Sequence, residues 1–379
     1  MCDLSERATL WVIDAHSLVT AVAAGVAWGR HPLHVKLAAV ISLGASMPSV
    51  LLLHLDGRMP NLALMRIAHH HRARGDQVRL QRIGRGRPIQ PTLGEPTPDH
   101  VYASAIFKFS KPLIEMVRRE YPDAIIGGTG TDVARTLEGV GIATEGTIDY
   151  SDYSDYTASL GFTQRGCRLR CGFCVVPTKE GAVRGAHTIA EIWRGDPWPR
   201  DIHLLDNDFF GQEHWRDRID ELRAGGFRVN FNQGINARFL TDESAAAIAS
   251  VKYRNVNMRD RRIYTAWDNA RDEARLFLGL EALVRHGVKR SHIVVYLLVG
   301  YDPAETAADR DDRRSKLRAF GATPYPMPYV RTRELMGFQR FCVRNIDKSV
   351  RWSDFARAGY YAENIAPAGQ SSLFEVAGA

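Results

Sequence analysis

Short apolar runs alternate with amphipathic helical patterns along most of the chain, and this alternation predicts an α/β fold. The first four apolar runs predict strands at 49–55, 77–83, 100–107 and 123–130. Helical patterns lie between the first and second and between the third and fourth of these strands, at 62–75 and 111–121. Strand–helix–strand units of this length predict a small doubly wound, Rossmann-like domain over residues 47–150.

A longer series of the same kind fills residues 151–330. Six further strands are predicted, at 159–164, 201–206, 227–233, 262–268, 292–300 and 323–329. Five helical patterns separate them, at 188–193, 213–225, 242–251, 273–287 and 305–321. Repeated βα units predict a partial (βα)6 TIM-type barrel, with its chemistry at the carboxyl ends of the strands.

Two flanking segments lie outside these series. Residues 331–379 form a C-terminal tail for which we predict no particular structure. Residues 1–46 form an N-terminal extension with two open interpretations. It either belongs to the native protein or reflects an upstream choice of start site, because the sequence from Met47 already opens like a first strand.

Composition indicates a globular protein, with 45% hydrophobic and 25% charged residues. A formal charge of +7 favours an anionic partner without requiring one. The apolar run at 17–29 is too short to span a bilayer, and Asp3 and Glu6 occupy the region where a signal peptide would be positive. We therefore expect no membrane partner. Five cysteines in a chain of this length do not predict a disulfide framework, so we expect a cytoplasmic location where thiols stay reduced.

Three of the five cysteines lie within the stretch GCRLRCGFC, as Cys167, Cys171 and Cys174. This C-x3-C-x2-C spacing, on a loop after the first strand of the second series, allows three thiolates to converge on one metal centre. A structural zinc site takes four ligands, usually as two pairs, and here His187 is the nearest plausible fourth ligand. A [4Fe–4S] cluster held by three cysteines would instead leave one iron open, which favours catalysis.

With Phe173 directly before the last cysteine, and with its position after the first strand of a (βα)6-like series, this motif resembles that of the radical S-adenosylmethionine (radical SAM) superfamily. The resemblance implies that the three thiolates hold a [4Fe–4S] cluster whose open iron binds S-adenosylmethionine. Reductive cleavage of that cofactor would give a 5′-deoxyadenosyl radical, which abstracts hydrogen from a substrate that the sequence does not identify. The resemblance also implies an electron donor such as flavodoxin or ferredoxin.

Polar residues at the ends of the later strands are candidates for binding S-adenosylmethionine. LLDNDFFG resembles an Asp-Asp-x-Phe variant of the family motif that contacts the amino group of the ligand. Together with Phe173, the candidates are Asp206, Asn207 and Asp208 after the second strand, Asn232, Gln233 and Arg238 after the third, Asp268 after the fourth and Gly300 after the fifth. Each has an ordinary structural alternative, as a polar strand end or a tight-turn glycine.

A small doubly wound domain in front of such a barrel resembles the cobalamin-binding domains of many radical methyltransferases. The D-x-H-x-x-G motif that supplies a histidine to cobalt is absent, since the first loop reads DGRMPN, and members without that histidine exist. The glycine-rich stretch IIGGTGTD either approaches a nucleotide tail or forms only the turn that the fold needs. A cobalamin-dependent methyltransferase or an RNA-modifying enzyme therefore stays open as an alternative.

The run of histidine and arginine at 69–88 has two interpretations. It could contact RNA phosphates, or it could be a solvated helix face followed by a basic loop, and we favour the second because no RNA-binding module is recognisable. Three consecutive histidines, His69, His70 and His71, cannot all face one metal from a helix. An alternative of another class is a nucleic-acid-binding protein in which zinc at the cysteines is structural.

Overall fold

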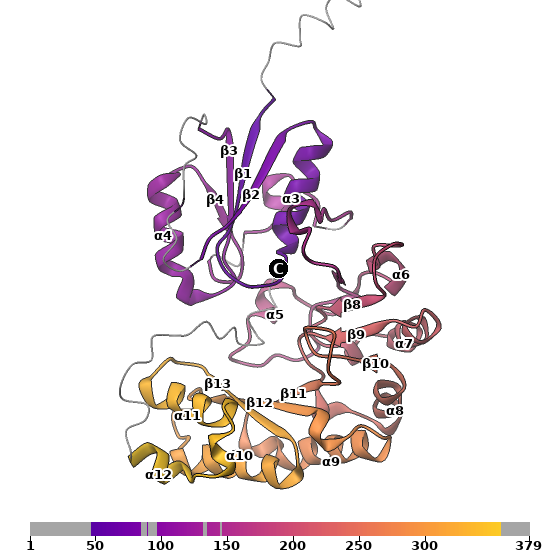
Figure 1. The fold of residues 1–379 in the computed structure, drawn as a ribbon, viewed down its shortest axis with the longest axis vertical. Coiled ribbons are helices and arrows are strands. Elements are labelled where there is room, and N and C mark those ends of the chain that lie inside the picture. The colour runs from indigo at the N-terminus through magenta and orange to yellow at the C-terminus, as the bar shows by residue number, and fades with distance from the viewer. Residues whose placement is uncertain (1–46, 85–88, 90–96, 132–134, 145, 358–379) are drawn as a thin grey trace, which may run out of the picture. The chain divides into compact units, whose positions relative to one another are not determined.

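The structure is a computed structural model that describes residues 47–84, 89, 97–131, 135–144 and 146–357. The N-terminal extension 1–46, part of the basic run at 85–88 and the end of the tail at 358–379 lie outside the described residues. The chain divides after Met47, and the described residues from Pro48 onward belong to one unit. This unit is an α/β fold built on parallel sheets, as the sequence predicts (Figure 1).

The first sheet has four parallel strands in the order β2-β1-β3-β4. Its elements are β1 (Ser49–His54), α3 (Leu62–Ala73), β2 (Gln77–Arg82), β3 (His100–Ser104), α4 (Lys111–Glu120) and β4 (Ile125–Gly127). All six lie inside the predicted segments. The strand order reverses at β1, because β2 and β3 lie on its opposite sides, and ligands of open α/β sheets commonly bind at the carboxyl ends of strands beside such a point.

Alternate residues of β1 are buried on opposite faces of this sheet. Leu52 contributes to a hydrophobic cluster with Leu64 of α3, whereas Leu53 contributes to another with Ile114 of α4. Helices therefore cover both faces, as Figure 1 shows for α3 and α4. A strand buried on both faces has a nearly continuous run of apolar residues, which explains the sequence SVLLLH. The side chain of Asn61 begins α3 by accepting a hydrogen bond from the backbone N–H of Leu64.

The second strand series forms two parallel sheets in which the strands follow one another in chain order. One contains β5 (Ser159–Gly161), β8 (Asp201–Leu204), β9 (Arg228–Phe231) and β10 (Lys252–Tyr253), and the other contains β11 (Ile263–Trp267), β12 (Ile293–Val299) and β13 (Thr323–Pro328). The connecting helices are α6 (Ile189–Ile192), α7 (Trp215–Ala224), α8 (Asp242–Ser250), α9 (Glu273–Arg285) and α10 (Ala307–Phe320). Beyond the end of β9, the backbone N–H of Ile235 donates to the carbonyl of Tyr264 at 2.7 Å, which links the two sheets.

The predicted strand at 159–164 is two separate elements. β5 ends at Gly161, and the next two-residue strand, β6 (Gln164–Arg165), pairs antiparallel with β7 (Arg184–Gly185). The polypeptide between β6 and β7 contains all three clustered cysteines and the short helix α5 (Val176–Lys179). This two-stranded ribbon therefore defines the cysteine loop, residues 166–183.

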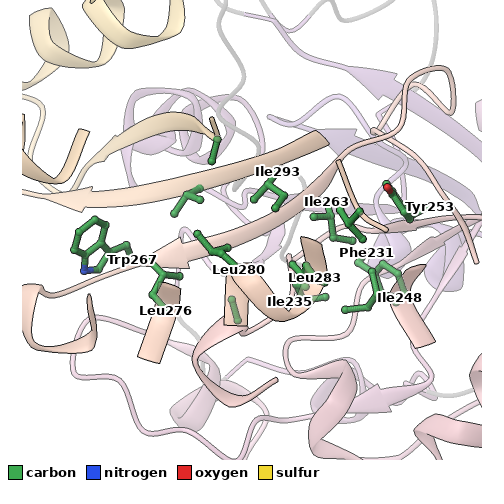
Figure 2. Close-up of a cluster of buried hydrophobic side chains, with 14 of the residues drawn as sticks. Phe231, Ile235, Ile248, Tyr253, Ile263, Trp267, Leu276, Leu280, Leu283 and Ile293 are labelled. Carbon is green, nitrogen blue, oxygen red and sulfur yellow. The ribbon is translucent and has the colours of Figure 1, made fainter. Parts of the chain in front are cut away.

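A large hydrophobic core joins the two sheets to their helices. Figure 2 shows strand residues such as Phe231 and Ile263 beside helix residues such as Ile248 and Leu283. Trp267, at the end of β11, is fully buried beside Leu276 and Leu280 of α9 in the same core. The carboxyl ends of β9 and β11 are thus held by packing against helices.

The C-terminal segment is helical where the structure describes it. Helix α11 (Arg333–Val343) begins at Thr332, whose side chain accepts from the N–H of Leu335, and α12 (Trp352–Arg357) follows. Phe338 and Phe341 of α11 are almost completely buried in the large core. The segment we treat as a tail without predicted structure therefore completes that core.

Helix α9 approaches the chain after β9 so closely that only glycine fits at one position. A Cβ added to Gly279 would lie 1.9 Å from the carbonyl oxygen of Ala237. Alanine at this position should lower the free energy of unfolding by roughly 1–3 kcal/mol, although alanine favours an isolated helix over glycine by about 1 kcal/mol. Chemical denaturation of Gly279→Ala measures the change.

The matched control is Gly185→Ala, because a Cβ at Gly185 would meet nothing within 4 Å and the backbone there is not left-handed. Its effect should stay within about 0.5 kcal/mol. Equal stability of the two variants would contradict the close approach.

Candidate functional site

The carboxylate of Glu180 closes the base of the cysteine loop. It accepts hydrogen bonds from the backbone N–H of Gly166 at 3.0 Å and from the guanidinium of Arg165 at 3.1 Å. It also accepts from the side-chain amide of Asn207, after β8, at 3.1 Å. Gly166 has φ of 77°, and a Cβ there would lie 2.2 Å from the carbonyl oxygen of Ala182, so both ends of the loop meet at a position that requires glycine.

All three clustered cysteines line one cavity of about 810 Å³, together with Arg168 and Arg170. Each is a half-buried free thiol. A tight turn from Cys171 to Cys174 is closed by a backbone hydrogen bond of 2.9 Å. Over the described residues, no three His, Cys, Asp or Glu side chains are close enough to hold a metal ion. The loop brings the thiols to one cavity without forming a ready-made ligand triad.

His187, the nearest fourth ligand suggested by the sequence, does not line this cavity. It lines a separate cavity with Tyr150 and Trp198, and its imidazole lies 4.0 Å from Glu191. A Cys3His set is therefore not assembled by the structure.

Burial raises the pKa of all three thiols. The pKa of Cys167 rises to about 11, chiefly by burial, although the N–H of Leu169 donates to its sulfur. Burial is also the largest cause at Cys171 and Cys174, and at Cys171 the nearby Arg238 acts in the opposite direction. The three groups are consequently neutral thiols near pH 7, and metal binding would have to displace their protons.

A second cavity, of about 850 Å³, begins at the same loop. Cys171 and Gly172 line both cavities, and the second is also lined by residues that follow β11 and β12, among them Asp268 and Tyr301. The ring of Phe173 meets that of Tyr301 edge to face, with centroids 5.4 Å apart. The loop thus borders a cavity at the carboxyl ends of parallel strands, the position that the sequence predicts for the chemistry.

Two of the predicted residues, Arg238 and Asp268, come together in this second cavity. The guanidinium of Arg238 is hydrogen bonded to Asp272 and lies 3.9 Å from Asp268. Burial raises the pKa of Asp268, and Arg238 opposes that shift. Both side chains act electrostatically on Cys171. A fixed cation beside a partly desolvated carboxyl can orient a zwitterionic ligand.

The three candidates after β8 have different surroundings. Asp206 is buried and accepts a hydrogen bond of 2.6 Å from the backbone N–H of Gln164. Burial raises the pKa of Asp206 to about 7. Asp208 forms an ion pair with Arg168, whose Nε lies 2.8 Å from the carboxylate. Asp206 therefore supports β6, whereas Asp208 contacts the cysteine loop itself.

Asn232, Gln233 and Gly300 do not line either cavity beside the cysteines. Asn232 is buried and donates to the side-chain oxygen of Asn230 at 3.1 Å. Gly300 has φ of 75°, and its backbone N–H donates to Glu305 at 2.8 Å. Gly300 thus fits its structural alternative, a tight-turn glycine.

Sequence reasoning missed several residues that shape the site. Tyr301 follows the predicted Gly300 directly, and Arg168 lies inside the quoted cysteine stretch, so both could have been found by extending the candidates by one position. Glu180 follows the short helix α5 and Asp272 directly precedes α9, neither in a recognisable motif, and only the folded chain shows that they anchor Gly166 and Arg238.

Of the run at 69–88, the structure describes 69–84, where His69 and Arg74 are exposed but His71 and Arg72 between them are not. His71 is buried, lies 2.6 Å from Asp76 and contacts the hydroxyl of Tyr102 at 3.1 Å. Arg72 pairs with two acidic side chains from the segment before β5, Asp149 and Asp152. These residues therefore stabilise the fold.

We found no protein-family model, curated protein or solved structure that matches this chain. Within the described ranges, none of the helices combines the length and the apolar character needed to cross a membrane.

In the folded, metal-free protein, the high pKa of Cys167 should make its alkylation slow below pH 9. A pKa of about 11 instead of 9.0 lowers the thiolate fraction about 100-fold. The rate of iodoacetamide modification, followed by peptide mass spectrometry, should still be rising beyond pH 9. Unfolding in urea removes the burial and supplies the control. Equal pH profiles in the folded and unfolded protein would contradict the raised pKa.

Asp206 should make the protein less stable as pH rises from about 4 to 7. Its pKa is raised on folding from 3.8 to about 7, so the folded state binds more protons in this range and stability falls with increasing pH. Asp206→Asn should reduce the decrease in the free energy of unfolding over this pH range by roughly 1–3 kcal/mol, because the amide is neutral throughout. Denaturation at several pH values measures it, with exposed Asp217→Asn as control. An unchanged pH dependence would argue against a buried, protonated Asp206.

Proposed function

We propose that this chain is a radical SAM enzyme that abstracts a hydrogen atom from its substrate. The observation that carries the proposal is the C-x3-C-x2-C loop between β6 and β7, whose three thiols all line one cavity. Its position after the first strand of the second parallel series, at the carboxyl end of that strand, supports it further.

The chemistry of the donor set fits an iron–sulfur cluster with one open iron. Cys167, Cys171 and Cys174 would hold it, because thiolates are the usual ligands of such clusters. Zinc is less well supported, since a structural zinc site takes four ligands and His187, the nearest candidate for the fourth, lies at another cavity. Iron uptake has to displace thiol protons and draw the three sulfurs together, so assembly should be favoured by rising pH.

When bound, the cluster supplies the electron that cleaves S-adenosylmethionine to methionine and a 5′-deoxyadenosyl radical. The protein residues of the second cavity would bind and orient that cofactor. Arg238, held by Asp272, offers a fixed cation for a carboxylate, and Asp268 offers an acceptor for an ammonium group. Phe173 and Tyr301, whose rings meet edge to face, would form an aromatic wall for the cofactor beside Cys171.

We infer that the two sheets of the second series together form a partial (βα)6 barrel preceded by a Rossmann-like domain. The succession of strands in chain order and the Ile235–Tyr264 hydrogen bond support this arrangement. The proposal includes a cytoplasmic location and a one-electron donor such as flavodoxin or ferredoxin, since the thiols and the cluster need a reducing environment. Cobalamin stays a prediction from the sequence, and no histidine is present in the DGRMPN loop.

Anaerobic reconstitution tests the proposal. The protein should take up iron and sulfide as one oxygen-sensitive [4Fe–4S] centre and, with a strong reductant, release 5′-deoxyadenosine from S-adenosylmethionine. Replacing Cys167, Cys171 or Cys174 by Ala should abolish both, because three thiolates are the minimum set.

The control is Cys342→Ala, since Cys342 is buried in α11 and does not line the cysteine cavity. It should retain iron while losing some stability. One equivalent of tightly bound zinc with no iron uptake would overturn the proposal in favour of a structural metal site.

A further inference from the structure

A further cavity, of about 190 Å³, lies at the carboxyl ends of β3 and β4 in the first sheet. Ser104, Gly127 and Gly128 line it, together with residues of the first turns of α3 such as Leu62. Three basic side chains from the cysteine-loop region complete its wall: Arg165, Lys179 and Arg184. The carboxyl ends of the strands in an open α/β sheet are the usual place for a ligand.

The ionisable residues of this cavity are mostly cationic. Five basic residues line it, Arg66, Arg135, Arg165, Lys179 and Arg184, against one acid, Glu138. Clustered cations repel one another unless an anion compensates them. This composition therefore favours an anionic ligand.

Two of these cationic side chains, those of Lys179 and Arg165, still have N–H groups that can donate hydrogen bonds to a ligand. Lys179 donates to the neutral hydroxyl of Thr129 at 2.8 Å and, among the described residues, forms no ion pair. Burial lowers the pKa of Lys179, the direction expected for a cation with few compensating partners. Arg165 is buried and bound to Glu180 through one terminal nitrogen, but its Nε has no hydrogen-bond partner within the described part of the chain.

The rest of the cavity wall is largely apolar. Its aliphatic lining comes from α3, β4 and the segment before β5, and the side chains are Leu62, Leu64, Ile67, Ile125, Leu137 and Val140. A lining that combines cationic and aliphatic side chains suits a ligand with one anionic group and a small apolar body. Arginine and lysine together match a phosphate oxyanion especially well.

The three glycines of the stretch IIGGTG differ in how much space surrounds them. A Cβ at Gly128 or Gly130 would lie within 2.5 Å of the backbone oxygen of Ala105 or Phe107, so the fold requires both. A Cβ at Gly127 would meet nothing within 4 Å, and its backbone is not left-handed. Gly127 therefore leaves open space at a position that lines the cavity.

We propose that this cavity binds a small organic phosphate ester, with the phosphate at Lys179 and Arg165 and the organic group against the aliphatic lining. The inference does not rest on the radical SAM assignment, because none of the three cysteines lines this cavity. It assigns the first sheet a binding role next to the cysteine loop.

Isothermal titration calorimetry of the full-length protein with phenyl phosphate tests the proposal. One saturable site is expected. Inorganic phosphate should bind more weakly because it lacks the organic group, and benzoate should bind more weakly because its carboxylate has less charge and fewer acceptor oxygens than a phosphate. Lys179→Met should weaken phenyl phosphate binding about tenfold or more, since a charge-assisted hydrogen bond is lost. The matched control is Lys252→Met on β10, whose ammonium donates to the exposed carbonyl of Gly226 and does not line this cavity.

Gly127→Val gives a second variant that changes no charge. Its side chain should fill open space and weaken binding, while thermal unfolding reports that the protein remains folded. Both variants should keep the iron content of the wild type, which separates this site from the cysteines. Absence of saturable binding by the wild type, equal loss in the two lysine variants, or benzoate or inorganic phosphate binding as tightly as phenyl phosphate would each overturn the proposal.

Discussion

The hydrogen bonds of Glu180 determine where the cysteine loop lies. One carboxylate joins Gly166 at the start of the loop, Arg165 in β6 and Asn207 after β8. Its side chain is only 6% exposed, so these bonds form away from bulk water, where an unpaired partner would be costly. The Glu180 carboxylate therefore holds the base of the cysteine loop and the β6–β7 ribbon. It also connects them to the segment that follows β8. All three thiols of the loop held in this way line one cavity.

A close backbone approach supports Arg238, which lines the second cavity. Helix α9 contacts the chain at Ala237 through Gly279, and Arg238 is the next residue. Ala237 is also held by a hydrogen bond of 3.1 Å from its N–H to the side chain of Thr265 in β11. Arg238 therefore extends from a backbone fixed by a helix and a strand. Rigid support of this kind lets a cation hold its place before any ligand binds.

Much of the fold is predictable because its strands are buried on both faces. β12 reads IVVYLLV and lies within the predicted 292–300, and β1 is equally continuous. The division of 159–164 into β5 and β6 is not predictable, because it depends on the antiparallel partner β7, twenty residues further along the chain. Helix α11 has an apolar periodicity that could have been recognised, since Leu335, Phe338 and Phe341 recur every three residues.

The sequence indicates which residue types follow the strands at the candidate site, but it does not indicate the direction or the contacts of each side chain. Residues that follow parallel strands can lie close together because the strands end at one edge, and Arg238 and Asp268 lie 3.9 Å apart. The position of a residue after a strand does not specify the direction of its side chain. Asp206 is buried and accepts from the backbone N–H of Gln164, whereas Asp208, two residues later, pairs with Arg168. Residues such as Glu180 act through contacts across the fold, and no local pattern indicates them.

Arg165 belongs to two environments at once. One terminal nitrogen binds Glu180 at the base of the cysteine loop. The same side chain lines the cavity of about 190 Å³ at the carboxyl ends of β3 and β4. Any anion that draws this guanidinium toward the cavity acts on the bond that closes the loop. Thermodynamic linkage makes that influence mutual, so ordering of the loop changes the affinity for the anion by the same factor as the anion changes the ordering. The guanidinium of Arg165 is thus a physical route for heterotropic coupling between the first sheet and the thiols.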